Sequence, residues 1–432
     1  MNRFKPTWNS LRGHELPPWY DEAKLGIFIH WGPYSVPAYA PPTGELGTIP
    51  DSEWFIRNPY AEWYYNSVNV GEGPTYEHHI KTYGKDFPYE RFADMWKAEN
   101  WDPEAWADLF AAAGAKYVVL VTKHHDGFCL FPSRYTDYHT GSRGPRRDIV
   151  GELAQAVRKR GLRFGCYYSA IIDWRFMHEP IFNDWDCHNL NCPTYEYADY
   201  AFKQWMELVD NYHPDVLWND IGWPYAGERQ LPHLLAHYYN TCPEGVVNDR
   251  FNDLWHDYWT KEYELGSATS EEKWEMTRGM GLSFGYNAEE DERHILTPQQ
   301  LTGLLSSTVG RNGNLLINVG PMADGTIPAL QEQSLRGMGR WLAVNGEAIY
   351  HTRPDGSPIA GDGVKAYFVR RDGRRYMLVE GVSGEERLLP GVTGEYTAMD
   401  AAAGVKTRAV EGGLLISAVH GEGFPVALVR KE

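Results

Sequence analysis

The chain has 432 residues and a formal net charge of -17, with 58 acidic residues against 41 Lys and Arg. This charge opposes polyanionic partners, and no basic run could follow a phosphate backbone, so we expect no nucleic-acid partner. The length exceeds one ordinary domain and suits an α/β barrel with a smaller module attached. Aromatic residues make up 14% of the chain, including 17 Trp and 28 Tyr. That content favours a site that stacks flat apolar ligand faces.

Targeting segments and cysteine motifs are missing from the sequence. The first residues contain no apolar core of a signal peptide, and no later stretch approaches eighteen consecutive apolar residues. We therefore expect no membrane partner and a cytoplasmic protein, unless a leader has been removed. The five cysteines form no C-x-x-C pair, which predicts reduced thiols and no zinc or redox motif. Association into a homo-oligomer is left open.

The first 350 residues alternate apolar β-rich runs with amphipathic helices, which is the pattern of βα units around a parallel sheet. A helix is expected over 147–161, where Asp148 can cap the start, and another over 327–350. Strands are expected at 25–32, 117–125, 163–170, 215–222, 245–250, 281–287 and 314–320. This pattern predicts an α/β fold, a TIM-like (β/α) barrel of seven or eight strands whose closure is left open.

The pattern changes beyond about residue 350, where no helical period persists. Short alternating runs follow, divided by Asp-Gly, Ser-Gly, Thr-Gly and Gly-Gly. Such dipeptides mark hairpin turns. We therefore expect a catalytic barrel over residues 1–350 and a small antiparallel β-sandwich over residues 351–432.

Polar side chains gather where the predicted strands end, and in a (β/α) barrel those ends carry the active residues. The strand ends read His30-Trp31, His124-His125-Asp126, Tyr167-Tyr168, Trp218-Asn219-Asp220 and Asn248-Asp249-Arg250. Alternate residues of a strand share a face, so Trp218 and Asp220 are expected on one side. Five such ends together predict a catalytic pocket.

Each of these residues also has an ordinary structural interpretation. His30 alone could be a buried histidine bonded to backbone, and Arg250 could form a structural ion pair with Asp249 or Asp253. Adjacent strand residues point apart, and neither H-x-H nor H-E-x-x-H spacing is present, so no metal and no other cofactor is expected.

Aromatics, imidazoles, an arginine and two or more carboxylates, without a nucleotide loop or a nucleophile elbow, are what glycoside hydrolysis requires. One carboxylate stays ionised, while burial raises the pKa of a second carboxyl that protonates the leaving oxygen. A barrel glycosidase acting on another sugar, such as a galactoside, stays open as an alternative. A non-catalytic sugar-binding protein and a metal-dependent barrel hydrolase are the other two.

Up to about residue 350 the sequence resembles the α-L-fucosidases of glycoside hydrolase family 29. The resemblance is carried by KLGIFIHWGPYSVPAY, AKYVVLVTKHHDGFCL, RFGCYYS, PDVLWNDIGWP, VVNDR, GLSFGYN and GNLLINVGP. It implies a barrel followed by a β-sandwich, and a retaining exo-α-L-fucosidase. Such an enzyme hydrolyses terminal α-L-fucosyl residues of oligosaccharides or glycoconjugates by double displacement, through a covalent fucosyl-enzyme intermediate.

The resemblance also assigns roles to residues. It implies that Asp220 is the nucleophile and that Glu262, in TKEYELG, is the acid/base, with Glu264 as the obvious rival and Asp253 and Asp257 as further carboxylates nearby. Phe284 resembles the aromatic residue beside the methyl group of the fucose. The substrate-binding residues implied are His30, Glu62, Trp63, His124, His125, Tyr167, Trp218, Arg250 and Phe284.

Overall fold

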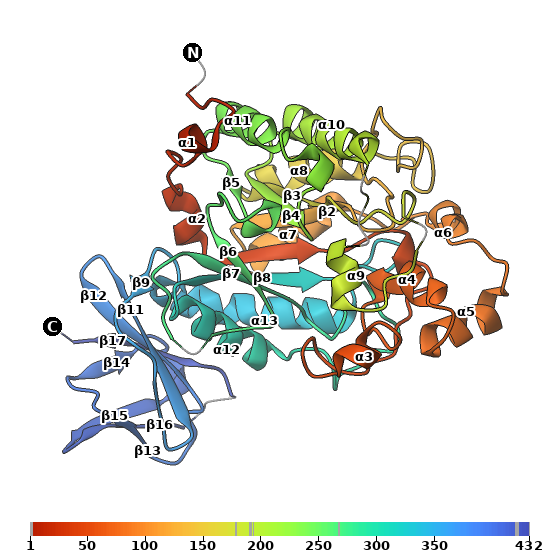
Figure 1. Cartoon of the computed structure of the whole chain (residues 1–432). Coiled ribbons are helices and arrows are strands. Elements are labelled where there is room, and N and C mark those ends of the chain that lie inside the picture. The colour runs from red at the N-terminus through yellow and green to blue at the C-terminus, as the bar shows by residue number, and fades with distance from the viewer. Residues whose placement is uncertain are drawn as a thin grey trace.

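The computed structural model describes residues 3–177, 179–189, 192, 194–266, 268–419 and 423–431. In this part of the chain eight parallel strands form one curled sheet, in the order β5-β4-β3-β2-β1-β8-β7-β6 (Figure 1). The strands are β1 (Leu25–Ile29), β2 (Tyr117–Lys123), β3 (Arg163–Ser169), β4 (Val216–Asp220), β5 (Val246–Val247), β6 (Trp259–Glu262), β7 (Trp274–Gly279) and β8 (Gly313–Val319).

The two edges of this sheet meet through little hydrogen bonding. Just beyond β5 and just before β6, Asn248 and Tyr258 form an isolated parallel bridge, and the Asp257 N–H donates to the Val247 carbonyl at 2.9 Å. Strands such as β1, β2 and β8 are buried along their whole length, as expected where helices cover one face of a parallel sheet and the barrel core the other. The predicted barrel class is confirmed, with an imperfect seam between β5 and β6.

Helices surround the sheet. They are α1 (Trp8–Leu11), α2 (Pro18–Ala23), α3 (Asp51–Trp54), α4 (Tyr64–Asn69), α5 (Pro74–Tyr83), α6 (Glu90–Met95), α7 (Pro103–Ala112), α8 (Ile149–Lys159), α9 (Asp184–Asn189), α10 (Tyr195–Tyr212), α11 (Leu231–Thr241), α12 (Pro298–Val309) and α13 (Ala329–Asn345). The 3₁₀ turns are η1 (Pro33–Ser35), η2 (Ala61–Trp63), η3 (Tyr225–Gly227), η4 (Asp249–Phe251), η5 (Gly346–Ala348) and η6 (Ala401–Ala403).

The two helices that were expected from the sequence are α8 and α13. The Asp148 side chain caps α8 by accepting from the Gly151 N–H at 2.9 Å. The short elements α3 to α6, together with α9, lie beyond the arrowheads of the central strands in Figure 1. They therefore surround the end of the barrel at which active residues are expected.

One strand prediction is wrong, and two strands were not predicted. Residues 281–287 form a loop after β7 instead of a strand. Two of the loop's amide groups donate to a side chain, because the N–H groups of Leu282 and Ser283 reach Glu290 Oε1 at 3.0 and 2.8 Å. A backbone whose donors bind side chains cannot form a regular ladder. The strands β6 and β7 were not predicted because their sequences, WTKE and WEMTRG, show no apolar run.

Beyond α13 the chain forms two antiparallel sheets, at the lower left of Figure 1. The larger sheet has the order β10-β11-β12-β17-β14, with β9 paired to β11, and the smaller has the order β13-β16-β15. The strands are β9 (Arg353–Pro354), β10 (Ile359–Gly361), β11 (Val364–Arg371), β12 (Arg374–Glu380), β13 (Arg387–Pro390), β14 (Tyr396–Ala398), β15 (Val405–Val410), β16 (Gly413–Ala418) and β17 (Val426–Arg430).

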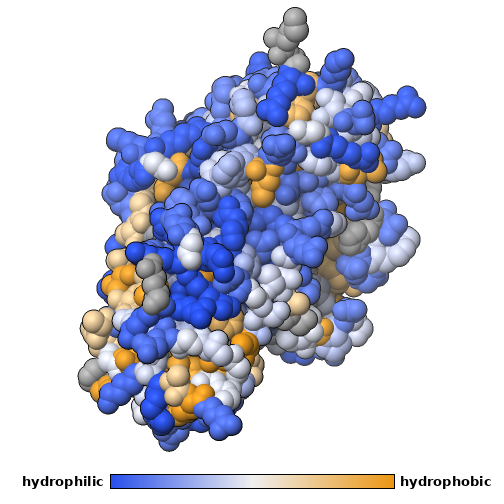
Figure 2. Space-filling model, turned by 90° about the vertical axis from the view of Figure 1, so that its left-hand side faces the viewer, coloured by the Kyte–Doolittle hydropathy of each residue, from blue (hydrophilic) through white to orange (hydrophobic). Residues whose placement is uncertain are grey.

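The predicted β-sandwich class is confirmed by the packing between these sheets. Phe368 and Met377 of the larger sheet share a buried cluster with Leu414 and Ile416 of the smaller one. Asp372 and Gly373, which connect β11 to β12, both have positive φ, at 48° and 81°, as a two-residue hairpin turn of the Asp-Gly kind requires. Figure 2 shows hydrophilic side chains over most of the barrel and more hydrophobic ones on the lower lobe.

None of the helices in the described ranges combines the length and the apolarity that a membrane crossing demands.

Candidate active site

A cavity of about 190 Å³ is formed largely by residues at the carboxyl ends of the barrel strands and in the loops that follow them. All eleven residues that the family resemblance singled out line this one cavity. Nine further lining residues were not predicted: Phe28, Leu46, Trp54, Phe55, Tyr60, Asp184, Cys187, Ile221 and Thr277. Two of these carried a usable signal, because Phe28 shares strand parity with His30 and Tyr60 precedes Glu62 by two residues.

Asp220 ends β4, and its carboxylate accepts hydrogen bonds on both oxygens. Oδ2 accepts from the Tyr167 hydroxyl at 2.7 Å, and Oδ1 accepts from Arg250 Nη1 at 2.7 Å and from the Ile221 N–H at 3.0 Å. Burial is the largest single effect and acts to raise the pKa of Asp220, but the nearby Arg250 charge and the hydrogen bonds from Tyr167 and Arg250 together outweigh it, so the pKa lies below its ordinary value. The geometry therefore keeps this buried carboxylate ionised.

The chain leaves β4 in a strained conformation. Ile221 has a φ of 65° and Gly222 a φ of 121°. A left-handed conformation costs a β-branched residue roughly 1–2 kcal/mol. This strain turns the chain sharply at the strand end and brings the Ile221 N–H onto Asp220, which is the kind of local cost found at functional sites.

Arg250 bridges two carboxylates. While Nη1 donates to Asp220, Nη2 donates to Glu262 Oε2 at 3.0 Å, and the Tyr60 hydroxyl donates to Glu262 Oε1 at 2.9 Å. Arg250 Nε donates to Thr260 Oγ1 at 3.0 Å, and the guanidinium lies 4.8 Å from the centre of the Trp218 ring. These contacts fix the orientation of the guanidinium plane.

Among the carboxylates that competed for the acid/base assignment, the structure brings only Glu262 into the cavity. Glu264 and Asp253 are exposed and do not line it. Asp257 accepts from the Tyr239 hydroxyl at 2.9 Å and from the Val247 N–H at 2.8 Å, and it also pairs with His14. Asp257 therefore belongs to the barrel seam.

The three histidines of the cavity are neutral, and two of them are held by a hydrogen bond to a neighbouring side chain. Nδ1 of His30 bonds Asn318 Oδ1 at 2.7 Å, and Nδ1 of His125 bonds Ser169 Oγ at 2.6 Å. Burial lowers the pKa of His30 to about 4 and that of His125 to about 3, and it also lowers the pKa of His124 well below its ordinary value. A neutral imidazole offers one donor and one acceptor, which suits a hydroxyl group.

Glu62 lies in η2 and is buried. Its Oε2 accepts from the Gly285 N–H at 2.7 Å and from the Ser283 hydroxyl at 3.2 Å, which attaches the 281–287 loop to the cavity. Burial raises the pKa of Glu62 to about 7. Its neighbour Trp63 packs edge-on against His125, with ring centres 5.0 Å apart.

The indole N–H of Trp218 donates to a buried carboxyl group that was not predicted from the sequence. Glu275 of β7 accepts from Trp218 Nε1 at 2.9 Å and from the hydroxyls of Tyr20 and Tyr117 at 2.9 and 2.5 Å. Burial raises the pKa of Glu275 to about 7. The ring of Phe28 packs 5.0 Å from that of Trp218, so one side of the cavity is a fixed apolar wall.

Within the ranges that the structure describes, no three His, Cys, Asp or Glu side chains are placed to hold a metal ion. Asp126, next to the histidine pair, accepts instead from the Tyr89 hydroxyl at 2.9 Å and from the Phe128 N–H at 3.1 Å.

Two carboxylates joined by one guanidinium, in a cavity of indoles and neutral imidazoles at the carboxyl end of a barrel, define the class of glycoside hydrolases. The sequence model of the family described as "Alpha-L-fucosidase" matches residues 1–347. The chain therefore belongs to the alpha-L-fucosidase family, and it is an enzyme that hydrolyses α-L-fucosides.

Relatives and solved structures agree with this assignment. The alpha-L-fucosidase of Branchiostoma floridae is 38% identical over 377 residues, which cover 82% of this chain and 76% of that protein. The tissue alpha-L-fucosidase of Bos taurus is 37% identical over 364 residues, covering 82% and 72%. The structure of the Thermotoga maritima alpha-L-fucosynthase in complex with alpha-L-Fuc-(1-2)-beta-L-Fuc-N3 is 48% identical, covers all of both chains and has a TM-score of 0.94.

Proposed function

We propose that the enzyme is a retaining exo-α-L-fucosidase that acts by double displacement, with Asp220 as nucleophile and Glu262 as acid/base. The observation that carries this proposal is the bridge of Arg250 to both carboxylates, at 2.7 and 3.0 Å. Carboxyl groups spanned by one guanidinium lie close together. This favours the separation of about 5 to 5.5 Å that retaining enzymes use over the ~6.5–9.5 Å of inverting enzymes.

In the first step an oxygen of Asp220 attacks the anomeric carbon of the fucose, and the bond from that carbon to the leaving oxygen breaks. Glu262 gives its proton to the leaving oxygen, which departs as a hydroxyl group. Asp220 suits the attack because its pKa is below the ordinary value, so it is ionised over the neutral range.

In the second step the Glu262 carboxylate takes a proton from water. The oxygen of that water attacks the anomeric carbon and releases Asp220, so the fucose leaves with its original configuration. Glu262 returns to the protonated form that the first step needs. Water reaches Glu262 more readily than Asp220, because the Glu262 side chain is 21% exposed and that of Asp220 10%.

The shape of the cavity supports release of a terminal fucose. At about 190 Å³ it is small, and Phe284 packs against His30 and Tyr60, with ring centres at 4.9 and 5.4 Å. A methyl group fits this wall, whereas the extra hydroxyl of a galactoside would lack a hydrogen-bond partner there. The Thermotoga maritima alpha-fucosidase solved in complex with fucose, 48% identical with a TM-score of 0.90, supports the same substrate.

The nucleophile is tested by trapping. Incubation with 2-deoxy-2-fluoro-fucosyl fluoride should add one fluorofucosyl group to the peptide that carries Asp220, as identified by mass spectrometry. A label on another carboxylate would overturn the assignment.

The two roles are separated by azide rescue of alanine variants on an aryl α-L-fucoside. With azide, Asp220→Ala should yield the β-fucosyl azide, because azide replaces the nucleophile in a single displacement. Glu262→Ala should yield the α-fucosyl azide, because azide attacks the fucosyl-enzyme in place of water. Glu264→Ala should behave like the parent enzyme. A β product from the Glu262 variant would assign the roles the other way round.

We further propose a cytoplasmic location, which the five free cysteines support because unpaired thiols suit a reducing compartment. Fractionation of the source cells tests it, and activity found only outside the cytoplasm would contradict it.

A further inference from the structure

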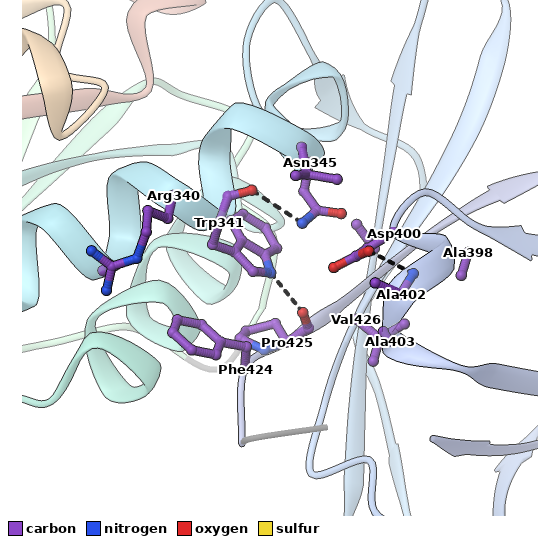
Figure 3. Close-up of a pocket in the computed structure, with 13 residues that line it drawn as sticks. Arg340, Trp341, Asn345, Ala398, Asp400, Ala402, Ala403, Phe424, Pro425 and Val426 are labelled. Carbon is purple, nitrogen blue, oxygen red and sulfur yellow. Dashed lines mark hydrogen bonds between the residues drawn. The ribbon is translucent and has the colours of Figure 1, made fainter. Parts of the chain in front are cut away.

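A second cavity, of about 400 Å³, lies between the end of α13 and the β-sandwich. Figure 3 shows Trp341 and Asn345 reaching it from the helix, and Asp400, Phe424 and Pro425 bounding it from the chain of the sandwich. Barrel helices run opposite to the strands, so the end of α13 lies where the strands begin. The cavity is therefore remote from the catalytic one.

The cavity is preformed because a hydrogen bond joins its two sides. The Trp341 indole N–H donates to the Pro425 carbonyl at 2.8 Å, and Trp341 is only 8% exposed. Its ring forms an apolar wall together with Pro425, Val426 and the partly buried Phe424. A volume of this size lies within the usual range of small-molecule pockets, about 300 to 1,000 Å³.

Two acceptor groups line the same space, and one of them, the Asn345 side-chain oxygen, lacks a donor. Asn345 is 2% exposed, and its Nδ2 donates to the Trp341 carbonyl at 3.1 Å, which fixes the amide. Asn345 Oδ1 is buried and has no hydrogen-bond partner, which is unfavourable until a ligand donates to it. One oxygen of Asp400 accepts from the Ala402 N–H at 2.9 Å. In Figure 3 the oxygens of Asn345 and Asp400 are turned toward the same gap between helix and sandwich.

Because the side-chain oxygens of Asn345 and Asp400 are acceptors, a ligand of this cavity must donate hydrogen bonds to them. A hydroxyl-bearing molecule satisfies both acceptors, and the exposed Arg340 at the rim can donate to its remaining oxygens. An anion would meet two acceptor oxygens, and a purely apolar molecule would leave both without a partner. The apolar wall requires a C–H face beside the hydroxyls, and a pyranose ring provides one.

We propose that this cavity is a second, non-catalytic binding site for a neutral sugar ring. On a glycan with several branches, such a site would hold the enzyme near further substrate while the catalytic cavity turns over, because linked binding events raise the effective concentration. The proposal does not depend on which carboxylates carry out the catalysis.

Saturation-transfer NMR with L-fucose and D-galactose tests the site on the full chain, with the catalytic cavity filled by an iminocyclitol inhibitor. Complete inhibition of aryl fucoside hydrolysis confirms that filling. Transfer to at least one of the two sugars should persist, and its affinity should fall about tenfold in Asp400→Ala, which is the loss of one hydrogen bond of ~1.4 kcal/mol. Glu411→Ala, an exposed acid in a sandwich turn, is the matched control and should bind like the parent.

Asn345→Leu removes the buried acceptor and should weaken binding as well. If the Asn345→Leu protein fails to fold, Arg340→Ala provides a second variant at the surface. This variant should also weaken sugar binding, because it removes the donor at the rim. All variants except an unfolded one should hydrolyse a small aryl fucoside at the parent rate. Loss of all transfer once the inhibitor is bound would overturn the proposal, since only the catalytic cavity would then hold sugar. Equal affinities of Asp400→Ala and Glu411→Ala for the sugar would also overturn it. The proposal would fail as well if light scattering showed that the enzyme is a dimer and that Asp400→Arg breaks it, because a second copy of the chain would then occupy the cavity.

Discussion

Replacement of Arg250 perturbs both proposed catalytic carboxylates at once. Arg250→Met keeps an apolar chain over Trp218 but removes the charge and the donors to Asp220 and Glu262. Arg250→Lys keeps the charge, yet a single ammonium cannot present the planar fork that spans both carboxylates. The two variants therefore separate the contribution of charge from that of bridging geometry.

The magnitude follows from the two bonds. A hydrogen bond to a charged group contributes about 1.5–3 kcal/mol. If both bonds hold the transition state, the methionine variant loses about 3–6 kcal/mol, or roughly 10²- to 10⁴-fold in kcat/KM. The lysine variant keeps one bond and should lose about 10- to 10²-fold.

The pH profile supplies an independent measurement. The Arg250 charge lowers the pKa of Asp220 against the opposing effect of burial. Without that charge the pKa rises, and because Asp220 must be ionised to attack, the acid limb of kcat/KM moves to higher pH. Stability should follow the same direction. Because the pKa of Asp220 is lower in the folded enzyme than in the unfolded chain, its ionisation stabilises the fold above the unfolded pKa, and this stability is lost as the pH falls through the folded pKa.

The assay is kcat/KM on an aryl α-L-fucoside across the pH range, with thermal melting of each variant. Arg408→Met, which removes an exposed pair with Glu386 in the sandwich, is the matched control and should leave both measurements near the parent values. A well-folded Arg250→Met enzyme with parent activity and an unmoved acid limb would refute the reasoning.

Other consequences can be measured with single substitutions. Glu62→Gln should increase the free energy of unfolding by on the order of 3 kcal/mol at pH 8 and by almost nothing at pH 4, as measured by urea unfolding. The reason is that burial raises the pKa of Glu62 to about 7, so the folded state loses stability as the pH rises from 4.5 to 7. Equal gains at both pH values would contradict this. Tyr60→Phe should lower kcat/KM about 10- to 100-fold on poor leaving groups and less on good ones, since it removes one donor to Glu262, and a uniform loss would disprove that link. Glu275→Leu should lower the melting temperature far more than Glu275→Gln, because leucine leaves three buried donors unpaired. Activity should survive a chelator unchanged, and a loss that zinc restores would favour a metal-dependent hydrolase.

The catalytic cavity was predictable where its residues end predicted strands. The alternation of a strand places Trp218 and Asp220 on one side, and the barrel brings the ends of distant strands to one place whatever their separation in sequence. His30, Tyr167 and Asp220 lie on β1, β3 and β4 or just past their ends, and all three line the same cavity.

The predictions failed where polar residues are buried inside the barrel. In β7 the side chains of Glu275 and Thr277 are buried, although the alternation of apolar and polar residues along this strand predicts that they face solvent. Their burial depends on partners from other strands, such as the hydroxyls of Tyr20 and Tyr117 for Glu275. No local pattern encodes a partner that is more than a hundred residues away.

The contacts made by loops were the second feature that the sequence did not predict. Residues 281–287 look like a strand by composition, yet Glu62, more than two hundred positions earlier, accepts from the Gly285 N–H. Tyr60 reaches Glu262 over a similar separation. Such contacts depend on the path of each loop, which the order of apolar and polar residues does not specify.

The different surroundings of the two carboxyls explain how one guanidinium can serve both. Asp220 receives donors from Tyr167, Arg250 and the Ile221 amide in a nearly closed position, which keeps the free carboxylate ionised and ready to attack. Glu262 receives two donors and is about twice as exposed, so its proton can exchange with water between steps. A residue that must gain and lose a proton on every turnover belongs near the mouth of the cavity, and a nucleophile that must be ionised when it attacks belongs beneath it.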